Sequence, residues 1–407
     1  MAMTARFKTY KNTTLSSFRM KVFFATRVRG FFMQLFNAKN HGIEFSYASD
    51  KVYETNSTFS KIKNIIGRSR LFDFLGIIQQ IKGQQTECDM YGSFNRFLNV
   101  DKPYFIYVEN PTALFHYRLS RNQSYLGHKR LTKLINDKHL KGLVFMSNAC
   151  ASTFETVCSP IREECFHTVI YPYIPENKNI SLNAIDHKAN SQTFNLLFIA
   201  QGSRFLSKGA LEVVEAFKKL KGEKLNLRLR MITSINDVNK DLIASLQEID
   251  GISINDFKYS FEELQAIYAE SHLYVQPTSD DSFNITVLES LKSGLPIISS
   301  RLYAIPEMVI DGKNGFLCDP NYWFFDKSNI PNPKVWNNRK HTIYSGKTSP
   351  EITDFLVTKI KLLYNNRDLW RQMAYHSLNK ASQPPFSTTH IAAQWKSLTN
   401  SILSGNQ

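Results

Sequence analysis

One stretch of the chain, residues 275–320, constrains the fold most strongly because strand and helix signals alternate in and just before it. A short apolar segment, Leu273–Gln276, is followed by a polar turn at Ser279–Ser282 and by apolar residues at helical spacing from Asn284 to Ser293. Gly294 ends that helix, and a second apolar strand follows at Pro296–Ser299. This order predicts a parallel sheet with a helix that begins above the sheet edge. The helix start directs backbone N–H groups and a positive dipole end to that edge, where an anionic diphosphate is the natural ligand.

Two acidic residues, Asp281 and Glu289, stand eight positions apart across this turn and helix start. This pattern, an acidic residue followed by seven residues and then Glu, resembles the donor-site signature of the retaining glycosyltransferases of the GT-B fold, family 4. The pattern continues in the family's order through Gly294–Pro296, Pro306-Glu307, Asp311-Gly312 and Asn314–Leu317. The chain departs from the pattern where Asp281 replaces the usual Glu and where Tyr303-Ala304 replaces the usual Gly-Gly. An acid pair alone is a weak pattern, and the ordered flanking motifs make the resemblance specific.

The resemblance implies a role for each residue around the helix start. It implies that Glu289 holds ribose hydroxyls, that Asp281 holds hydroxyls of the donor sugar, and that backbone N–H groups at the helix start hold the diphosphate. The residues of this segment that we expect at the donor are Asp281, Ser282, Phe283, Asn284, Ile285 and Glu289. The alternative is purely structural, with Asp281 or Ser282 as a helix cap and Glu289 as a solvated helix residue. Glu307 is expected to order the loop behind the site.

A second candidate loop follows the segment Phe194–Ala200, whose continuous apolar run suits a parallel sheet. The loop, Gln201–Gly209, resembles the family's G-R-x-x-x-x-K-G stretch, which clamps the donor diphosphate. Lys208 matches the Lys directly, whereas Ser203 stands where the family has Arg and Arg204 comes one position late. We therefore expect the diphosphate near Gly202, Ser203, Arg204 and Lys208, because cations there stabilise the leaving group. Whether Arg204 or Ser203 takes the place of the family's Arg stays open. The alternative for Lys208 is an ordinary surface position, although a helix start is unfavourable for a cation.

The first half of the chain contributes two candidate positions. The apolar segment Met20–Thr26 predicts a first strand, and the loop after it, Arg27–Gly30, takes the place of a Gly-rich loop in the resembled family. Only Gly30 remains of those glycines, and we expect it near the substrates. After the predicted strand Tyr104–Val108 the family places a His, where this chain has Glu109. A carboxylate there would face the anomeric carbon of the donor, or else it is a solvated loop acid.

The length of 407 residues suits two domains of about 200 residues each. Strand and helix signals alternate in both halves, so we predict an α/β fold of the GT-B type, with two doubly wound Rossmann-like domains facing a central cleft. The predicted parts are an acceptor-side domain at 1–172, a linker at 173–192, a nucleotide-sugar-binding domain at 193–375, and a C-terminal helix within 376–407 that packs back on the first domain. Residues 321–350 interrupt the pattern and are an expected insertion. Further helices are expected over Phe59–Gly83 and Ile352–Tyr375.

Lysine and arginine outnumber aspartate and glutamate by 50 to 35, which gives a net charge of +15. A nucleotide-sugar site needs only a few cations, so the excess suits an anionic membrane surface, an acidic acceptor, nucleic acid or merely solvated surface. The basic amphipathic segment Phe59–Gly83 and the aromatic and basic segment 322–347 are candidate membrane contacts, although the first would equally suit a helix that covers a sheet. Five scattered cysteines fit a reducing compartment. No apolar run reaches the roughly 18 residues of a membrane span, and no signal-peptide core is present in the first 20 residues.

Together these features predict an enzyme: a retaining hexosyltransferase with a UDP- or GDP-sugar as donor and a saccharide or lipid-linked glycan as acceptor. Charge and family analogy suggest bacterial surface polysaccharide or lipopolysaccharide synthesis in the cytoplasm, peripheral on the inner face of the cytoplasmic membrane. We expect no metal or other cofactor, because GT-B sites generally use protein cations instead. Two alternatives stay open. One is a non-catalytic GT-B-like binding or scaffold protein, which Asp281 and Glu109 favour. The other is a basic nucleic-acid-binding protein, for which the sequence has no recognisable module.

Overall fold

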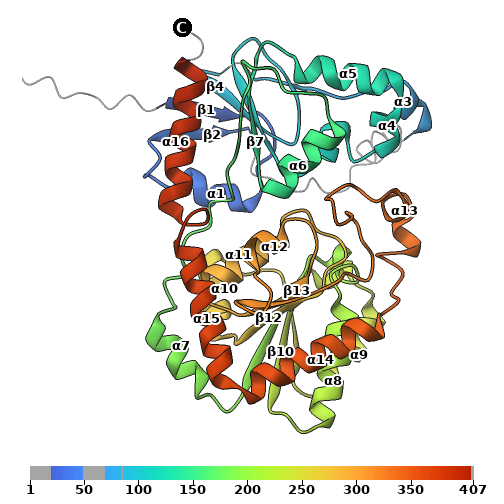
Figure 1. The fold of residues 1–407 in the computed structure, drawn as a ribbon, viewed down its shortest axis with the longest axis vertical. Helices are drawn as coiled ribbons and strands as arrows, with labels where there is room; N and C mark the ends of the chain where they lie inside the picture. Colours follow the sequence, from blue (N-terminus) through green and yellow to red (C-terminus); the bar gives the residue numbers. More distant parts are fainter. Residues whose placement is uncertain (1–19, 49–68, 85, 405–407) are drawn as a thin grey trace, which may run out of the picture.

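The computed structural model describes residues 20–48, 69–84 and 86–404, which form two α/β domains, one above the other in Figure 1. The sheet of the first domain has six strands, in spatial order β2 (Ile43–Tyr47), β1 (Met20–Phe24), β4 (Met90–Phe94), β6 (Tyr104–Val108), β7 (Leu140–Phe145) and β8 (Phe166–Val169). All neighbouring strands in it are parallel. The order reverses at β1, whose neighbours β2 and β4 lie on opposite sides, so this domain is doubly wound as predicted.

The helices of the first domain are short. They are α1 (Gly30–Asn37), α3 (Arg70–Phe74), the 3-10 turn η1 (Pro111–Phe115), α4 (Leu119–Gln123), α5 (Tyr125–Ile135) and α6 (Asn148–Val157), and a two-stranded sheet pairs β3 (Ile81–Lys82) with β5 (Leu98–Asn99). The predicted helix Phe59–Gly83 is wrong in its described part, where only α3 is helical, and its first half lies outside the described residues. Gly76 ends α3 in the left-handed conformation, with φ +60°, and a Cβ there would lie 2.2 Å from the backbone of Gly127.

The sheet of the second domain repeats this architecture. Its six parallel strands are, in spatial order, β11 (Ile252–Asp256), β10 (Leu227–Thr233), β9 (Phe194–Ile199), β12 (Leu273–Gln276), β13 (Ile297–Ser300) and β14 (Gly315–Cys318). The helices around it are α7 (Leu182–Ala189), α8 (Ala210–Gly222), α9 (Lys240–Gln247), α10 (Phe261–Glu270), α11 (Ile285–Lys292) and α12 (Ile305–Met308). The central strands β9, β12 and β13 are buried almost throughout, which explains their continuous apolar runs.

Two expectations about the chain's connections need correction. The expected linker 173–192 contains α7, which packs against the C-terminal helix α15 (Arg367–Ser382) and therefore belongs to the second domain. The expected helix Ile352–Tyr375 is two helices, α14 (Pro350–Asn365) and α15. Asn366 breaks the run because its side chain accepts a hydrogen bond from the Leu369 amide and caps α15.

The last helix, α16 (Thr388–Ser404), leaves the second domain and lies along the first, as Figure 1 shows. It contacts β7 and β8. Trp395 of this helix is buried, and its ring lies 5.6 Å from the rings of Phe105 and Tyr107, measured between centroids. An aromatic contact of this kind fixes the helix against the first sheet.

The expected insertion at 321–350 forms a compact segment with α13 (Pro333–Trp336) and the 3-10 turn η4 (Arg339–His341). Phe324 and Trp336 are buried, and their rings stack with centroids 4.2 Å apart. Trp336 also stacks on Tyr117 of the first domain, at 6.5 Å. The expected membrane contact of this segment is therefore corrected for Phe324 and Trp336, because both rings are buried within the segment and against the first domain.

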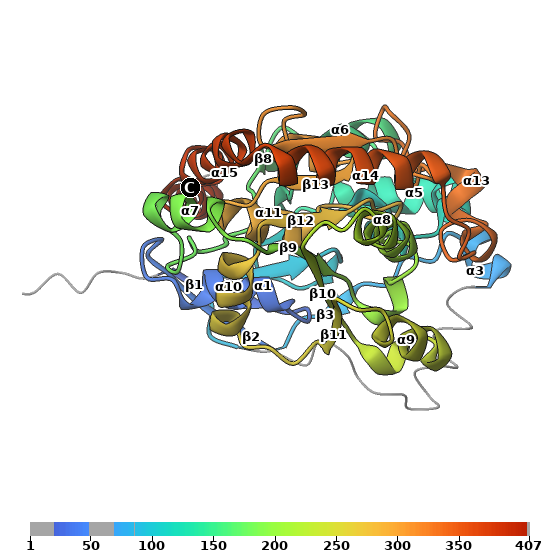
Figure 2. The same cartoon turned by 90° about the horizontal axis from the view of Figure 1, so that it is seen from below.

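The doubly wound order places a switch point in each sheet, and the loops that follow the strands there face the other domain (Figure 1). Figure 2 shows the molecule from below, so that the second domain is seen in front of the first. In the second domain the switch lies between β9 and β12, so residues 200–209 and 277–284 start side by side at the carboxyl edge. This is where open α/β sheets bind ligands. Both loops were predicted from sequence to belong to one site.

Candidate active site

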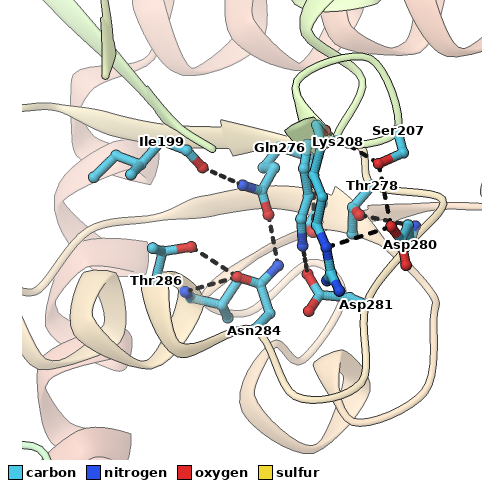
Figure 3. Close-up of polar contacts among 12 residues, drawn as sticks. Ile199, Ser207, Lys208, Gln276, Thr278, Asp280, Asp281, Asn284 and Thr286 are labelled. Carbon is cyan, nitrogen blue, oxygen red and sulfur yellow. Dashed lines mark hydrogen bonds and ion pairs between the residues drawn. The ribbon is translucent and has the colours of Figure 1, made fainter. Parts of the chain in front are cut away.

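The two loops meet through an ion pair between Lys208 and Asp281 (Figure 3). Both side chains are almost buried, with relative exposures of 10% and 8%. Gly209 makes this contact possible: its φ is +79°, and a Cβ there would lie 2.6 Å from Pro277. Burial raises the pKa of Asp281 above its ordinary value, although the Lys208 ammonium and the Arg204 guanidinium both oppose that shift.

Asp280, the residue before Asp281, holds the second cation of the site. Its Oδ2 lies 3.7 Å from Arg204 Nε, and it accepts hydrogen bonds from Ser207 Oγ at 3.3 Å and from the Tyr344 hydroxyl at 3.2 Å. The Asp280 carboxylate, and then that of Asp281, raise the pKa of Arg204. Arg204 and Lys208 thus lie in one cluster with two carboxylates, while Ser203 is exposed and Gly202 is buried in the turn η2 (Gly202–Arg204).

Helix α11 begins beside this cluster, as expected, and Asn284 caps it. The backbone of Asn284 has φ +71°, and its Oδ1 accepts hydrogen bonds from the Val287 amide at 3.4 Å and from Thr286 Oγ1 at 2.7 Å. Its Nδ2 donates to Gln276 Oε1 at 2.6 Å, which ties the cap to the end of β12 (Figure 3). Within the described residues, the amides of Phe283, Asn284 and Ile285 donate no hydrogen bond to protein. They remain available to an anionic ligand.

Glu289 lies one turn further along α11 and is paired with a tyrosine. The Tyr268 hydroxyl of α10 donates to Glu289 Oε2 at 2.7 Å. Burial raises the pKa of Glu289 to about 7, and the Tyr268 hydrogen bond opposes that shift only in part. A carboxyl group with such a pKa changes charge near neutrality, which is characteristic of functional sites.

Two of the predicted residues, Ser282 and Phe283, make contacts with the first domain. Ser282 Oγ accepts a hydrogen bond of 3.5 Å from Asn110 Nδ2, and the buried Phe283 ring lies 6.2 Å from the Tyr171 ring. The half-buried side chain of Ile285 belongs to the first turn of α11. Ser282 and Phe283 therefore extend the contact between the two domains into the predicted donor loop.

The first-domain candidates lie on the opposite side of the cleft. Glu109 follows β6 and forms an ion pair with Arg29, at 3.3 Å. The Glu109 charge also contributes, after those of Asp280 and Asp281, to raising the pKa of Arg204. Gly30 starts α1 next to Arg29, and a Cβ there would have nothing within 4 Å, so no steric demand explains this glycine.

Glu307 has a role that sequence reasoning did not foresee. We expected it to order the loop behind the site, but it reaches from α12 to the first domain. Its carboxylate accepts hydrogen bonds from the amides of Ala149 at 2.8 Å and Asn148 at 3.0 Å, and from the Tyr171 hydroxyl. The negative charge of Glu307 thus caps the positive end of α6 across the domain interface.

Three side chains that organise the site were not predicted from the sequence: Asp280, Tyr268 and Tyr344. Asp280 had a signal, because it stands beside Asp281 in the same loop. The two tyrosines come from α10 and from the inserted segment, and nothing in their local sequence indicates the contact.

Comparisons with known proteins bear on this site. Residues 183–323 match the family described as Glycosyl transferases group 1, and this stretch includes both candidate loops and all of α11. The D-inositol 3-phosphate glycosyltransferase of Pseudarthrobacter chlorophenolicus is 23% identical over 140 residues, 34% of this chain and 33% of that protein. A glycosyltransferase of Methanocaldococcus jannaschii is 24% identical over 195 residues, 46% of this chain and 52% of that protein.

A shorter but closer match is also found. The sulfoquinovosyl transferase of Arabidopsis thaliana is 36% identical over 62 residues, 14% of this chain and 12% of that protein. The chain thus matches about half or less of the length of these relatives.

Solved structures extend the likeness to nearly the whole chain. A glycosyltransferase from Rickettsia africae superposes with a TM-score of 0.57 at 14% identity, covering 95% of this chain and 99% of that chain. Anabaena HepE, solved in complex with UDP and glucose, superposes with a TM-score of 0.58 at 13% identity, covering 94% of this chain and 100% of that chain. The fold is that of the GT-B glycosyltransferases. The GT-B architecture predicted from the sequence is confirmed.

Within residues 20–48, 69–84 and 86–404, no helix combines the length and the apolar character needed to cross a membrane. In the same part of the chain, no three His, Cys, Asp or Glu side chains gather in a way that would hold a metal ion. That the site works without a metal stays a prediction.

Proposed function

We propose that this GT-B protein is a retaining glycosyltransferase that transfers a hexose from a nucleoside diphosphate sugar to a saccharide or lipid-linked glycan acceptor. The observation that carries the proposal is the cluster at the second switch point, where Lys208 and Arg204 lie with Asp281 and Asp280 beside the uncovered amides at the start of α11. Two cations and a helix start in one place suit a diphosphate. Its position in a segment that matches group 1 glycosyl transferases supports the same function.

In this proposal the donor rearranges the ion pairs of the free protein. Lys208 and Arg204 exchange carboxylate partners for diphosphate oxygens and stabilise the charge that develops on the leaving nucleotide. Asp281 is then released to accept hydrogen bonds from hydroxyls of the donor sugar. Glu289 holds the ribose hydroxyls, and its ionised form is favoured when two hydroxyls donate to it. Positioning and leaving-group stabilisation supply most of the rate.

The donor is proposed to be a UDP- or GDP-sugar. The UDP and glucose bound by Anabaena HepE support a uridine donor, because that protein shares the fold over nearly the whole chain. The acceptor is proposed to belong to bacterial surface polysaccharide or lipopolysaccharide synthesis, at the inner face of the cytoplasmic membrane. The charge of +15 supports the location.

The second candidate function is a non-catalytic GT-B-like binding or scaffold protein. The short Asp281 in place of Glu and the Arg29-paired Glu109 in place of His favour it, because both alter the sugar's side of the site. Donor hydrolysis or transfer distinguishes the two functions. Nucleic-acid binding is the least supported alternative, and salt-dependent binding to DNA would test it.

Calorimetry tests the proposed diphosphate site directly. Lys208→Ala should weaken the binding of a nucleoside diphosphate, because it removes a charge-assisted contact of about 1.5–3 kcal/mol, which corresponds to roughly tenfold or more in affinity. A panel of nucleotide sugars in a thermal-shift assay identifies which diphosphate to use, since a ligand at 100 times its Kd stabilises by about 2.7 kcal/mol. Lys240→Ala, an exposed change at the start of α9, is the control. Equal affinities of wild type and Lys208→Ala would remove Lys208 from the site.

A further inference from the structure

The first domain has a switch point of its own, between β1 and β4, and a cavity of about 450 Å³ opens there. Its walls come from the loop after β1, from the loop after β4 and from Tyr117. The position is equivalent to that of the donor loops in the second domain, because both lie at the carboxyl edge of a parallel sheet where the strand order reverses. Nothing in the donor site described above uses this cavity.

The cavity is strongly basic. Arg27, Arg29 and Arg96 line it, and among its lining residues that the structure describes there is no carboxylate. The acid beside it is Glu109, which pairs with Arg29 at 3.3 Å. The nearby His116 adds no charge, because burial and then the Arg96 guanidinium lower its pKa to about 3. The described walls thus present three guanidinium groups and no carboxylate of their own to the cavity.

Arg96 is the central cation of this arrangement. Its Nη1 donates to the carbonyls of Ala113 at 2.6 Å and Asn95 at 2.8 Å, which fixes the guanidinium in place. Among the described residues, Arg96 has no carboxylate within 4 Å and its Nε and Nη2 donate no hydrogen bond. A fixed guanidinium with one free edge is suited to bidentate recognition of a phosphate or carboxylate.

The backbone around Arg96 is held in an uncommon conformation. Asn95, His116 and Tyr117 all have positive φ, at 59°, 62° and 57°. Consecutive positive φ values at a His and a Tyr are costly and typical of functional sites. Tyr117 stacks on Trp336 of the inserted segment, with ring centroids 6.5 Å apart, and the Tyr344 hydroxyl of the same segment donates to Asp280 of the donor cluster at 3.2 Å. The inserted segment thus contacts both the cavity wall and the donor cluster.

We propose that this arginine cavity holds an anionic group of the acceptor, a phosphate or a carboxylate, next to the donor. The inference rests on the proposed function in one respect, since it names the acceptor's chemistry. Arg96 is its specificity-determining residue, with Arg27 and Arg29 at the rim. An acceptor with such a group would be placed beside Glu109 and facing the Lys208–Asp281 pair.

Titration calorimetry with inorganic phosphate, and separately with acetate, tests the proposal on the full chain. Wild type should bind the anion, and Arg96→Gln should raise its Kd by roughly tenfold or more, because one charge-assisted contact is lost. Arg130→Gln makes the same charge change at an exposed position of α5 and should leave the Kd within about twofold. Tighter binding of phosphate than of acetate identifies the group as a phosphate, and the reverse identifies a carboxylate.

Phosphate also suits the donor loop, so Lys208→Ala is titrated in parallel. The proposal expects Lys208→Ala to keep the phosphate binding that Arg96→Gln loses. It is overturned if wild type binds neither anion, or if Arg96→Gln binds them as wild type does. Should Arg96→Gln not fold, Arg27→Gln at the exposed rim replaces it, and an unchanged Kd in that variant overturns the proposal. Binding of the nucleoside diphosphate to Arg96→Gln should stay unchanged, whereas its failure to bind wild type would contradict the proposed function and not this cavity.

Discussion

At the scale of single residues, the half-buried carboxyl of Glu289 makes stability depend on pH. Its pKa in the folded protein is about 7 against an ordinary value of 4.5, so the folded state binds the proton more tightly than the unfolded state does. This contribution to stability is complete below about pH 4.5 and is lost as the pH rises through 7. At about 1.4 kcal/mol per pKa unit, the loss amounts to about 3 kcal/mol. In urea unfolding, wild type and Glu289→Gln should have similar unfolding free energies at pH 5, because Gln is uncharged like the protonated acid. At pH 8 wild type should be the less stable of the two, by a difference of that order. A difference in unfolding free energy that does not change between pH 5 and 8 would contradict a raised pKa.

Asp281 leads to a kinetic prediction at the same scale. Asp281→Asn keeps the size of the side chain but removes the carboxylate that partners Lys208, so donor positioning and charge balance are both lost. We expect turnover to fall by roughly two orders of magnitude, about 2.7 kcal/mol on the barrier, in steady-state assays with the donor found by thermal shift. Asp281→Glu restores the family's residue and should be tolerated. Near-native turnover of Asp281→Asn would argue for the non-catalytic alternative.

The motif residues could be predicted because their spacing along the chain reflects the strand–turn–helix units that carry them. Lys208, Asp281 and Glu289 lie on two adjacent strand–turn–helix units, and the parallel order of those units brings the loops together. Asp280, Tyr268 and Tyr344 could not be assigned in this way, since their contacts depend on how distant segments pack. Tyr303 is a similar case: it replaces a family glycine, and its hydroxyl lies 2.8 Å from Thr153 Oγ1 across the interface.

At the scale of elements, α12 and α6 form a link between the domains that the Glu307 carboxylate stabilises. Glu307→Gln keeps the shape but removes the charge that faces the amides of Asn148 and Ala149. We expect unfolding free energy to fall by about 1 kcal/mol and the radius of gyration in small-angle scattering to rise, because the domains separate more easily. Glu262→Gln, an exposed acid in the first turn of α10, is the matched control. An unchanged radius and stability would show that the apolar interface alone holds the domains together.

Elements were predicted well where a strand is buried on both faces and poorly where apolar residues lie at the surface. The strands β9 and β12 are recognisable in the sequence as continuous apolar runs, because both faces of the sheet are covered there. The apolar residues of 71–83 gave a false helix, since Gly76 turns the chain and Leu71 and Phe74 are exposed, at 62% and 68%. The break between α14 and α15 at Asn366 could not be predicted from the sequence. An asparagine inside a helical pattern caps a new helix only when the chain turns there.

At the scale of the whole molecule, two features bear on membrane binding: the net charge of +15 and an exposed apolar surface on the first domain. Helices α3 and α5 contact each other and together expose an apolar patch, which we define as Leu71, Phe74, Leu75, Tyr125 and Leu126. Exposed cations on the same two helices are Arg70, Lys129, Arg130 and Lys133. Apolar side chains among cations are the composition of a surface that binds anionic lipid. This patch replaces the buried aromatic residues of segment 321–350 as the candidate membrane contact.

The prediction is reversible binding to anionic vesicles. Each Lys or Arg near such a surface contributes about 1 kcal/mol, so four cations suffice without a spanning helix. The protein should sediment with anionic liposomes at low salt, return to the supernatant at high salt and ignore neutral liposomes. Phe74→Ser with Tyr125→Ser should weaken sedimentation, whereas Phe257→Ser, at a residue of the second domain that is 48% exposed, should not. If wild type stays in the supernatant with anionic liposomes at low ionic strength, the excess charge serves an acidic acceptor or is solvated surface. Anion binding at Arg96 then decides between these two, because only an acidic acceptor requires it.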